Sequence, residues 1–289
     1  MPHILFLLGD VAHARNDNHQ RLPGGFRHIG WEVSERPHDS ARIQAGSLRF
    51  GSADPGEFDL IWPLGFGTEA SFFDRMQLLD LLDPQQLVNG PRALTFLHGK
   101  YRWLELMPET HADNDVERLR QIIGQGGDWV IKPSAGSYGR DVVLVRAGED
   151  PLVALERLIS PGLGASQPPN YCIVQRFVPA ISAGETRALV AGGEIVGSYL
   201  RIPRDGLRAN LEANARVAAT TLTTAQTSLT RQVARELMDL GARFAAIDLV
   251  DGQLLEVNVA NPGGLATLEA IYGKDFSPEV ARRIAGPQN

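Results

Sequence analysis

The sequence predicts an α/β fold, and three features of its apolar pattern predict it. In the first third of the chain, short apolar runs alternate with amphipathic segments, as in a small parallel sheet covered by helices. In the middle, two apolar runs flank a glycine-bearing loop that begins after Lys132, which predicts a hairpin. The last third contains two more predicted hairpins, with turns at Ala191-Gly192-Gly193 and Asp251-Gly252.

The individual elements follow from periodicity and from turn residues. Helices are expected where apolar residues recur every three to four positions between a polar cap and a glycine, and strands where short apolar runs end at turns. The expected strands are Ile4–Leu8, Asp59–Pro63, Leu87–Asn89, Trp129–Lys132, Asp141–Val145, Tyr171–Phe177, Glu185–Val190, Glu194–Arg201, Ala245–Val250 and Leu254–Val259. The expected helices are Ser71–Leu82, Asp113–Gly124, Pro151–Ser160 and Leu222–Gly241.

Length and composition limit the class of protein. A chain of 289 residues suits two or three compact units around one cleft, and we expect boundaries at residues 1–93, 94–178 and 179–289. The net charge of -6, with basic residues scattered, argues against a nucleic-acid partner. Cys172 is the one cysteine, so no intrachain disulfide or multi-cysteine metal site forms. No apolar run reaches the roughly 20 residues of a membrane span, and the expected location is the cytoplasm.

A metal site is the strongest chemical prediction. Glu256 and Asn258 are two apart on a predicted strand, so they point to the same face. The Asp251-Gly252 turn folds the preceding strand back and places Asp248 opposite them. Two carboxylates and an amide oxygen on one sheet face suit Mg²⁺ that shares its coordination with phosphates. The alternative is that these carboxylates are solvated on an outer face, although both lie inside apolar runs.

A phosphate-binding loop is predicted after Lys132. A lysine at the end of an apolar strand can place its ammonium on phosphate oxygens, and the small residues beyond it allow backbone N–H groups to approach. The loop is not a Walker A motif, because no G-K-[ST] is present, and by itself it could be a plain hairpin turn. The loop residues of interest are Ser134, Gly136, Ser137, Tyr138 and Gly139.

Other candidate site residues are weak evidence when taken one at a time, but their order along the chain strengthens the prediction. Lys100 precedes Lys132 and suits a second phosphate contact, although a lone lysine is usually solvated. Gln175 to Val178 end a strand, where backbone groups could read an adenine edge. Arginine is the preferred fork for carboxylate and phosphoryl oxygens, yet most arginines are surface residues. The third unit contains Arg187, Arg201, Arg208 and Arg216, with Asn210 among them.

As a set, these motifs resemble the bacterial glutathione synthetase family of the ATP-grasp superfamily. The resemblance rests on DLIWPLGFGTEASFFDRMQLLDLL, LVNGPRALTFLHGKYRWLELMPET, WVIKPSAGSYG, PAISAGETRALVAGGEIVGSYLRIPRDGLRANL and AAIDLVDGQLLEVNVANPGG, in the family's order. It covers nearly the whole chain. It implies an ATP-grasp fold with an N-terminal parallel α/β substrate-binding domain, a central lid domain and a C-terminal catalytic domain.

The resemblance also implies roles for individual residues. The implied ATP-phosphate contacts are Lys100, Lys132, Ser134, Gly136, Ser137, Tyr138 and Gly139. The implied adenine and ribose contacts are Gln175, Phe177, Val178 and Glu185. The implied catalytic residues around the γ-phosphate, the acyl phosphate and the substrate are Arg187, Arg201, Asn210 and Arg216. The implied ligands of Mg²⁺, as two ions or with Mn²⁺ in their place, are Asp248, Glu256 and Asn258.

The expected activity is ATP-dependent ligation of γ-glutamylcysteine to glycine through an acylphosphate. The partners are then small peptides or amino acids, with no membrane partner, and a homo-oligomer is compatible with the sequence. Two departures from the family pattern keep alternatives open. Asn214-Ala215 replace a glycine pair, and Asn261-Pro262-Gly263-Gly264 replace a Ser/Thr-rich segment on the acceptor side. The alternatives are an amino-acid ligase with another acceptor, as in the ribosomal-protein ligase branch, and a nucleotide-binding sensor without catalysis.

Overall fold

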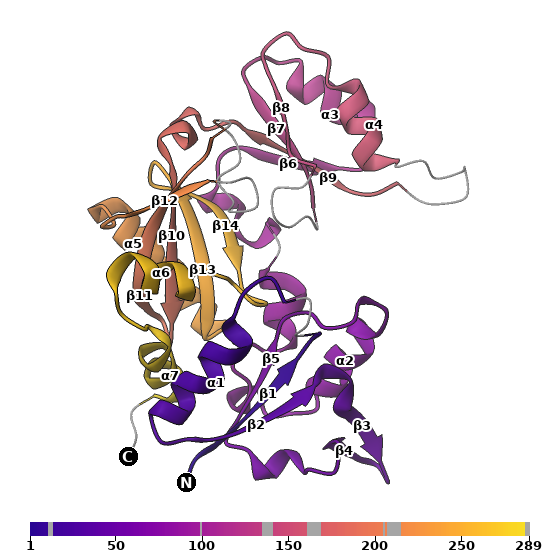
Figure 1. Ribbon diagram of the computed structural model, residues 1–289. Coiled ribbons are helices and arrows are strands. Elements are labelled where there is room, and N and C mark those ends of the chain that lie inside the picture. Colours follow the sequence, from indigo (N-terminus) through magenta and orange to yellow (C-terminus); the bar gives the residue numbers. More distant parts are fainter. Residues whose placement is uncertain are drawn as a thin grey trace.

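The computed structural model describes residues 1–10, 14–98, 100–134, 141–160, 169–204, 206 and 215–286. These residues form three main sheets and a small hairpin, β3-β4 (Figure 1). The strands are β1 His3–Leu8, β2 Glu32–Pro37, β3 Ala41–Gln44, β4 Ser47–Phe50, β5 Leu60–Leu64, β6 Thr110–Asp113, β7 Trp129–Pro133, β8 Val143–Val145, β9 Cys172–Arg176, β10 Glu185–Ala191, β11 Glu194–Ile202, β12 Arg216–Ala219, β13 Phe244–Val250 and β14 Gln253–Asn258. The α-helices are α1 Asn18–His28, α2 Phe72–Leu79, α3 Val116–Ile123, α4 Leu152–Ile159, α5 Thr224–Asp239, α6 Leu265–Tyr272 and α7 Ser277–Ala285.

The N-terminal sheet is parallel, with β1 between β2 and β5. Its central strand is apolar at nearly every position because both faces of a parallel sheet are covered. One face packs against α1 through Leu22 and Phe26. The other face packs against α2 through Met76 and Leu79. The carboxyl ends of β1 and β5 therefore meet at one edge of a rigid, buried sheet.

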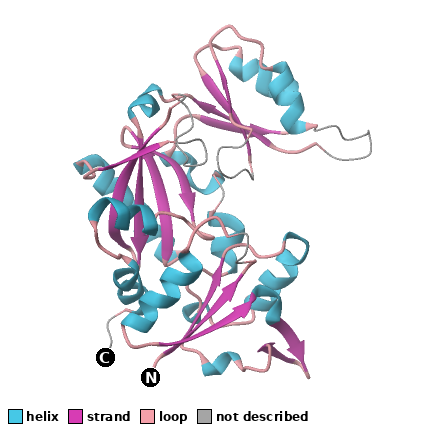
Figure 2. Cartoon of the chain, in the orientation of Figure 1, coloured by secondary structure: helices cyan, strands magenta, loops and turns pink. Residues whose placement is uncertain are grey.

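The C-terminal sheet is antiparallel, in the order β12-β11-β10-β13-β14, and its two faces pack differently. One face is covered by α5, whose Val233 and Leu237 join a core with Ile247 of β13. The other face shares a core with the N-terminal sheet, where the Trp62 and Phe244 ring centroids lie 5.5 Å apart. The N-terminal and C-terminal sheets are therefore joined through one apolar core, and Figure 2 shows them one above the other.

The central sheet, in the order β6-β9-β7-β8, has a core of its own. Its buried cluster is built from α3, α4 and the sheet, with Leu119, Trp129 and Leu155 fully buried, and all its members lie between residues 116 and 174. In Figure 1 this part projects from the rest of the molecule. A unit with a separate core is able to move as a body against its neighbours. Each main sheet lies within one of the three predicted ranges, and the exact boundaries stay a prediction.

Most predicted elements form within a few residues of the expected ends, but the strand expected over Leu87–Asn89 is wrong. Leu87 pairs with Ile61 and Asn89 with Ala242, each as an isolated bridge. The buried Asn89 amide donates to Phe244 O at 2.7 Å and Val259 O at 2.6 Å. The chain therefore crosses from one sheet to the next at this point, where a third parallel strand was expected.

Helix α1 was not predicted from the sequence, because its residues include Pro23, Gly24 and Gly25. Gly25 is required by packing: a Cβ there would meet the Ser277 carbonyl carbon at 2.6 Å. Glycine lowers the helix propensity of α1 at this position, but it allows α1 to approach α7 closely. Its first turn, beginning at Asn18, faces the C-terminal part of the chain, which is important for the site described below.

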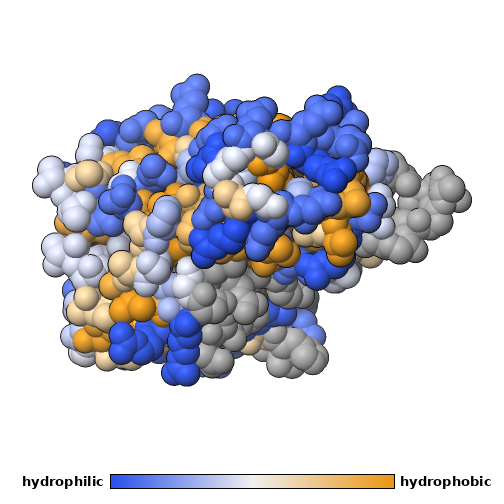
Figure 3. Space-filling view, turned by 90° about the horizontal axis from the view of Figure 1, so that it is seen from above, coloured by the Kyte–Doolittle hydropathy of each residue, from blue (hydrophilic) through white to orange (hydrophobic). Residues whose placement is uncertain are grey.

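Within the described ranges, no helix combines the length and apolar character needed to cross a membrane. Seen from above, apolar side chains form small areas separated by hydrophilic ones on that face (Figure 3).

Candidate active site

Charged residues line one end of a single face of the C-terminal sheet. In the strand registers, Glu185 lies opposite Arg201, Arg187 opposite Asp248, and Asp248 opposite Glu256. Directly opposite residues of antiparallel strands point to the same face, so all five side chains belong to it. We call this set, with Asn258, the polar face. Further along the same strands this side becomes the apolar core shared with the N-terminal sheet.

The predicted hairpin around Asp251-Gly252 brings the proposed metal ligands together. Both turn residues have positive φ, 48° and 75°, as a two-residue hairpin turn requires. Asn258 Nδ2 donates to Asp248 Oδ2 at 3.2 Å, and Glu256 is the register partner of Asp248. The side chains therefore meet as predicted, but through a register shift between Asp248 and Leu249 that the spacing did not indicate. Their role as metal ligands stays a prediction.

Asp248 is the most heavily paired carboxylate of the polar face. Arg187 donates from Nε to Oδ1 at 2.8 Å and from Nη2 to Oδ2 at 2.7 Å. Arg201 Nη2 lies 3.0 Å from the same Oδ2 and also pairs with Glu185. Burial by itself raises the pKa of Asp248, but the two guanidinium groups outweigh it and hold that pKa below its ordinary value. Asp248 is therefore ionised throughout the neutral range.

Glu256 pairs with a lysine from a distant segment. Lys100 Nζ lies 3.0 Å from Glu256 Oε1, and the lysine is 7% exposed. Burial raises the pKa of Glu256, but Lys100 outweighs it and the net shift is downward. His98 lies two residues before Lys100. Its Nδ1 accepts a hydrogen bond from the N–H of Val259, one residue after Asn258, at 3.2 Å, because a main-chain N–H can only donate.

Lys132, at the end of β7, approaches this group from the central sheet. Its ammonium donates to Gln175 Oε1 at 2.7 Å, and Gln175 donates to Thr110 Oγ1 at 2.8 Å. Burial lowers the pKa of Lys132 to about 7, the charge of Lys100 acts in the same direction, and Glu256 opposes them. The charges of Lys100 and Glu256 therefore both act on Lys132, although they come from other parts of the chain.

The donor set fits a hard divalent cation. Within the described ranges, no group of three or more His, Cys, Asp or Glu side chains could hold a metal, so the candidate set is two carboxylates and one amide. Oδ1 of Asp248 accepts one hydrogen bond from Arg187 and keeps a lone pair. Oxygen ligands supplemented by water and phosphate are what Mg²⁺ takes in nucleotide enzymes.

The remaining predicted nucleotide contacts within the described residues lie after β7, after β9 and at the start of β10. The N–H of Phe177 bonds Asp128 O at 3.0 Å, and the C=O of Val178 accepts from Ile181 N at 3.1 Å. The Arg146 guanidinium lies 5.4 Å from the Phe177 ring centroid. Ser134 Oγ donates to Tyr171 O at 3.2 Å. Glu185, expected to face the ribose, is 8% exposed and paired with Arg201.

Arg216 is not brought to the polar face. It is exposed on β12 at the edge of the sheet, with β11 between it and β10. Six further predicted residues lie outside the described residues. They are Gly136, Ser137, Tyr138 and Gly139 of the glycine-bearing loop, together with Arg208 and Asn210.

A pocket of about 300 Å³ opens at the carboxyl ends of β1 and β5, and the sequence did not predict it. We call it the strand-end pocket. Asp10, His19 and Thr68 provide polar groups, Phe66 provides an apolar wall, and Asn261 comes from the segment after β14. Ligands of parallel sheets bind at the carboxyl ends of their strands, which is the one signal that points to this pocket from sequence.

Comparison with known proteins identifies the family. The family described as prokaryotic glutathione synthetase, ATP-grasp domain, matches residues 99–273, which is more than half of the chain. The chain belongs to this family. The match includes Lys100, the central sheet and the whole polar face, so the residues of the charged site all lie inside it.

Curated relatives extend the similarity beyond the matched domain. A glutathione synthetase of Thermosynechococcus vestitus is 31% identical over 208 residues, which is 70% of this chain and 64% of the relative. A glutathione synthetase of Vibrio cholerae is 34% identical over 192 residues, which is 64% of this chain and 58% of the relative. The alignments thus span less than two thirds of these two relatives.

The fold is that of ATP-grasp proteins. The crystal structure of a RimK domain protein ATP-grasp from Sphaerobacter thermophilus superposes with a TM-score of 0.66 at 20% identity, covering 98% of this chain and all of that one. The crystal structure of the D-cycloserine synthetase DcsG superposes with a TM-score of 0.70 at 17% identity, covering 98% of each chain. The expected α/β ATP-grasp fold is therefore confirmed. The structure also shows what surrounds the two glycines of the segment after Asn258. A Cβ on Gly263 would meet Asn16 at 3.6 Å, and a Cβ on Gly264 would meet Tyr199 Oη at 3.2 Å.

Proposed function

We propose that this protein is an ATP- and Mg²⁺-dependent carboxylate–amine ligase that works through an acylphosphate, with γ-glutamylcysteine and glycine as first-choice substrates. The observation that carries the proposal is that Asp248, Glu256 and Asn258 converge on one sheet face and that Lys100 pairs with Glu256 there. The charges of Lys100 and Glu256 also act on Lys132. A scaffold without catalysis needs no converging oxygen ligands beside a lysine. Membership of the glutathione synthetase family supports the choice of substrates.

The charged site offers separate groups of residues for the nucleotide and for the metal. Lys100 and Lys132 would hold phosphate oxygens, with Gln175 to Val178 on the adenine side. Asp248, Glu256 and Asn258 would hold Mg²⁺, as two ions or with Mn²⁺ in their place. When bound, the metal supplies neutralisation of phosphate charge.

The arginines of the polar face are suited to the transferred phosphoryl group and to the substrate. The substrate carboxylate oxygen attacks the γ-phosphorus, the bond from this phosphorus to the bridging oxygen breaks, and ADP leaves. The amine then attacks the acyl carbon, loses a proton, and inorganic phosphate leaves. Arg187 and Arg201 would stabilise the oxyanion that develops in this second step. Their present partner, Asp248, already fixes them at the centre of the site.

The organic substrates would use the strand-end pocket. It combines polar groups with an apolar wall, and Asn261 connects it to the segment that follows Asn258. This supports residues 1–93 as the substrate-binding domain, 94–178 as the lid and 179–289 as the catalytic domain. A cytoplasmic location, small-molecule partners without nucleic acid, and a homo-oligomer are part of the same proposal.

A screen of substrate pairs tests the proposal. Purified protein with ATP and Mg²⁺ is given γ-glutamylcysteine, glutamate or other short γ-glutamyl compounds, each with glycine, alanine, serine or glutamate. Phosphate release with γ-glutamylcysteine and glycine, and not with glutamate alone, is the expected result. The Asn261-Pro262-Gly263-Gly264 segment favours one further candidate, an amino-acid ligase with another acceptor, and glutamate preference would establish it. ATP binding without turnover of any pair would instead indicate a sensor.

A further inference from the structure

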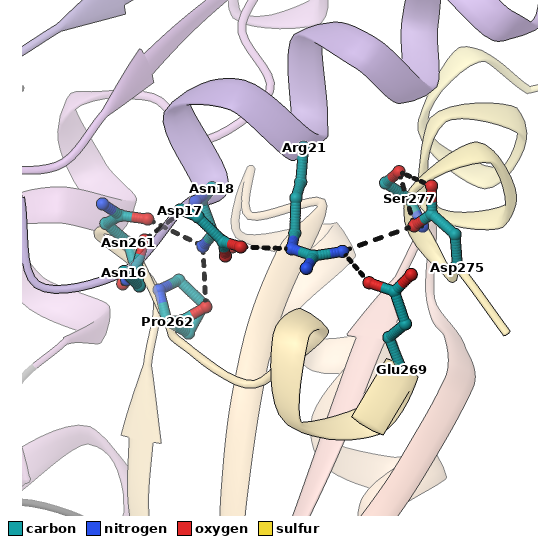
Figure 4. Close-up of polar contacts among 9 residues, drawn as sticks. All are labelled: Asn16, Asp17, Asn18, Arg21, Asn261, Pro262, Glu269, Asp275 and Ser277. Atoms are coloured by element: carbon teal, nitrogen blue, oxygen red, sulfur yellow. Dashed lines mark hydrogen bonds and ion pairs between the residues drawn. The ribbon is translucent and has the colours of Figure 1, made fainter. Parts of the chain in front are cut away.

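The first turn of α1 holds the segment that follows the proposed metal ligand Asn258. Asn18 is 1% exposed, and its Nδ2 donates to Asn261 Oδ1 at 2.8 Å and to Pro262 O at 2.9 Å (Figure 4). A main-chain carbonyl can only accept, so the bond to Pro262 fixes which way the Asn18 amide points. These bonds join residues more than 240 positions apart in the chain.

Two further bonds from the N-terminal domain hold the same segment. Asn16 Nδ2 donates to Asn261 O at 3.1 Å, and Gly65 N donates to Ala260 O at 2.8 Å. Residues 260–262 therefore accept hydrogen bonds from both the loop before α1 and the loop after β5. Both loops also line the strand-end pocket, through Ala14 and Gly65.

The other side of the segment reaches the polar face. Gly263 O lies 3.2 Å from Arg187 Nη1, whose remaining nitrogens hold Asp248. Asn261 lines the strand-end pocket. The segment is therefore a common wall, with the pocket on one side and the Arg187–Asp248 pair on the other.

We propose that Asn18 is a positioning residue that fixes this wall, and through it the binding of the organic substrates. The inference rests on the proposed function, since it assumes that the strand-end pocket receives these substrates. The competing explanation is that Asn18 only joins two domains. Arg21, one turn further along α1, provides the comparison. It pairs with Asp17 at 2.6 Å and with Glu269 of α6, and lies 4.0 Å from Asp275.

Asn18 and Arg21 thus cross the same interface from the same helix, but only Asn18 bonds the wall. Figure 4 shows Arg21 reaching toward α6 and Asp275 while Asn18 faces Asn261 and Pro262. Asn18→Asp keeps the volume and removes both donors, placing a carboxylate against the Pro262 carbonyl. Asn18→Ala removes the donors without adding charge. Arg21→Gln removes the ion pairs and leaves the wall's hydrogen bonds.

The test separates substrate positioning from domain packing. In both Asn18 variants the KM for at least one organic substrate should rise about ten-fold or more, because small displacements of a positioned group are costly. The KM for ATP should stay within about two-fold. Arg21→Gln should lower Tm and leave every KM unchanged. An Asn18 effect confined to Tm, or an equal rise in the KM for ATP, would overturn the proposal.

A second measurement does not depend on turnover. Hydrogen exchange of the ligand-free protein should speed up in residues 259–264 in both Asn18 variants and not in Arg21→Gln. Unchanged exchange there in Asn18→Asp would overturn the positioning role whatever the substrate. Failure of the wild-type protein to turn over any substrate pair, with the exchange result as expected, would reject the proposed function and leave the positioning of the wall established.

Discussion

Arg187 and Asp248 lie directly opposite each other on neighbouring strands, and Arg187 holds both oxygens of the carboxylate, at 2.8 and 2.7 Å. Arg201 adds a second cation at 3.0 Å. Burying one carboxylate between two guanidinium groups gives Asp248 a structural role in addition to its proposed metal role. Glu256, by contrast, has a side chain that is 31% exposed and one lysine partner.

This difference predicts that a substitution of Asp248 lowers both stability and turnover, whereas a substitution of Glu256 lowers mainly turnover. Asp248→Asn should abolish phosphate release and lower the free energy of unfolding by about 3–5 kcal/mol, because it leaves two buried guanidinium groups uncompensated. Glu256→Gln should abolish turnover and cost less, about 1–3 kcal/mol, because it leaves one buried cation, Lys100, without its charged partner. Urea denaturation with EDTA present, paired with phosphate-release assays, measures both quantities. Equal losses of stability in the two variants would contradict the structural role of Asp248.

The adjacent glycines of α1 provide a matched pair for packing. Gly25→Ala should destabilise the protein by about 2–3 kcal/mol, because its Cβ would overlap the Ser277 carbonyl carbon at 2.6 Å and force α1 and α7 apart. Gly24 has nothing within 4 Å of its Cβ position, so Gly24→Ala should be neutral or stabilise by about 0.5–1 kcal/mol through helix propensity. Urea denaturation midpoints of the two variants measure these changes in stability. A Gly25→Ala variant as stable as the wild type would show that α1 can shift without loss of stability.

The sequence was most informative where contacts are local. The turn at Asp251-Gly252 pairs Val250 with Gln253, so the return of Glu256 and Asn258 beside the strand of Asp248 was predictable from spacing. The register shift next to Asp248, which sets it opposite Glu256 and not Leu255, was not. The capping box of α5, in which Thr223 Oγ1 accepts from Gln226 N at 3.2 Å, likewise lies within four residues and marks the predicted start. In both cases the physical cause and the sequence signal occupy the same short stretch.

The contacts that the sequence did not predict join distant residues. Lys100 and Glu256 are 156 positions apart, and their ion pair depends on how the turn of residues 101–106 packs against β14. The Asn18 bonds depend on how the N-terminal domain packs on the C-terminal one. Helix α1 itself was not predicted, because Pro23 and two glycines disfavour a helix there. Periodicity carries no information about such packing, and close helix approach selects residues of low helix propensity.

Buried His38 predicts a pH dependence of stability. It is 3% exposed, with Nε2 3.3 Å from Leu64 O, and burial, assisted by Arg75, lowers its pKa to about 4. The unfolded chain protonates near pH 6.5 while the folded chain stays neutral, so stability is complete above pH 6.5 and is lost as the pH falls toward 4, by up to about 3 kcal/mol.

Urea denaturation at pH 7 and pH 4.5 measures this loss. His38→Gln should be less stable at pH 7 and should lose less on acidification than the wild type, since it has no proton to take up. His28→Gln, an exposed position at the end of α1, should keep the wild-type slope. Identical slopes in His38→Gln and the wild type would show that other groups control the acid response.

Lys132 connects nucleotide binding to pH, because its pKa is about 7 through burial and the nearby charge of Lys100. Above pH 7 the free protein holds this lysine increasingly as the neutral amine, and a bound phosphate would restore the ammonium by raising its pKa. ATP binding should therefore take up a proton, and the Kd for ATP should rise by about five- to ten-fold from pH 7.5 to 8.5.

Calorimetry at saturating Mg²⁺, in two buffers of different ionisation enthalpy, measures both the Kd and the number of protons taken up. Lys132→Arg stays charged over this range, so its profile should be flat. A wild-type profile as flat as that of Lys132→Arg, with no proton uptake, would remove Lys132 from the phosphate site.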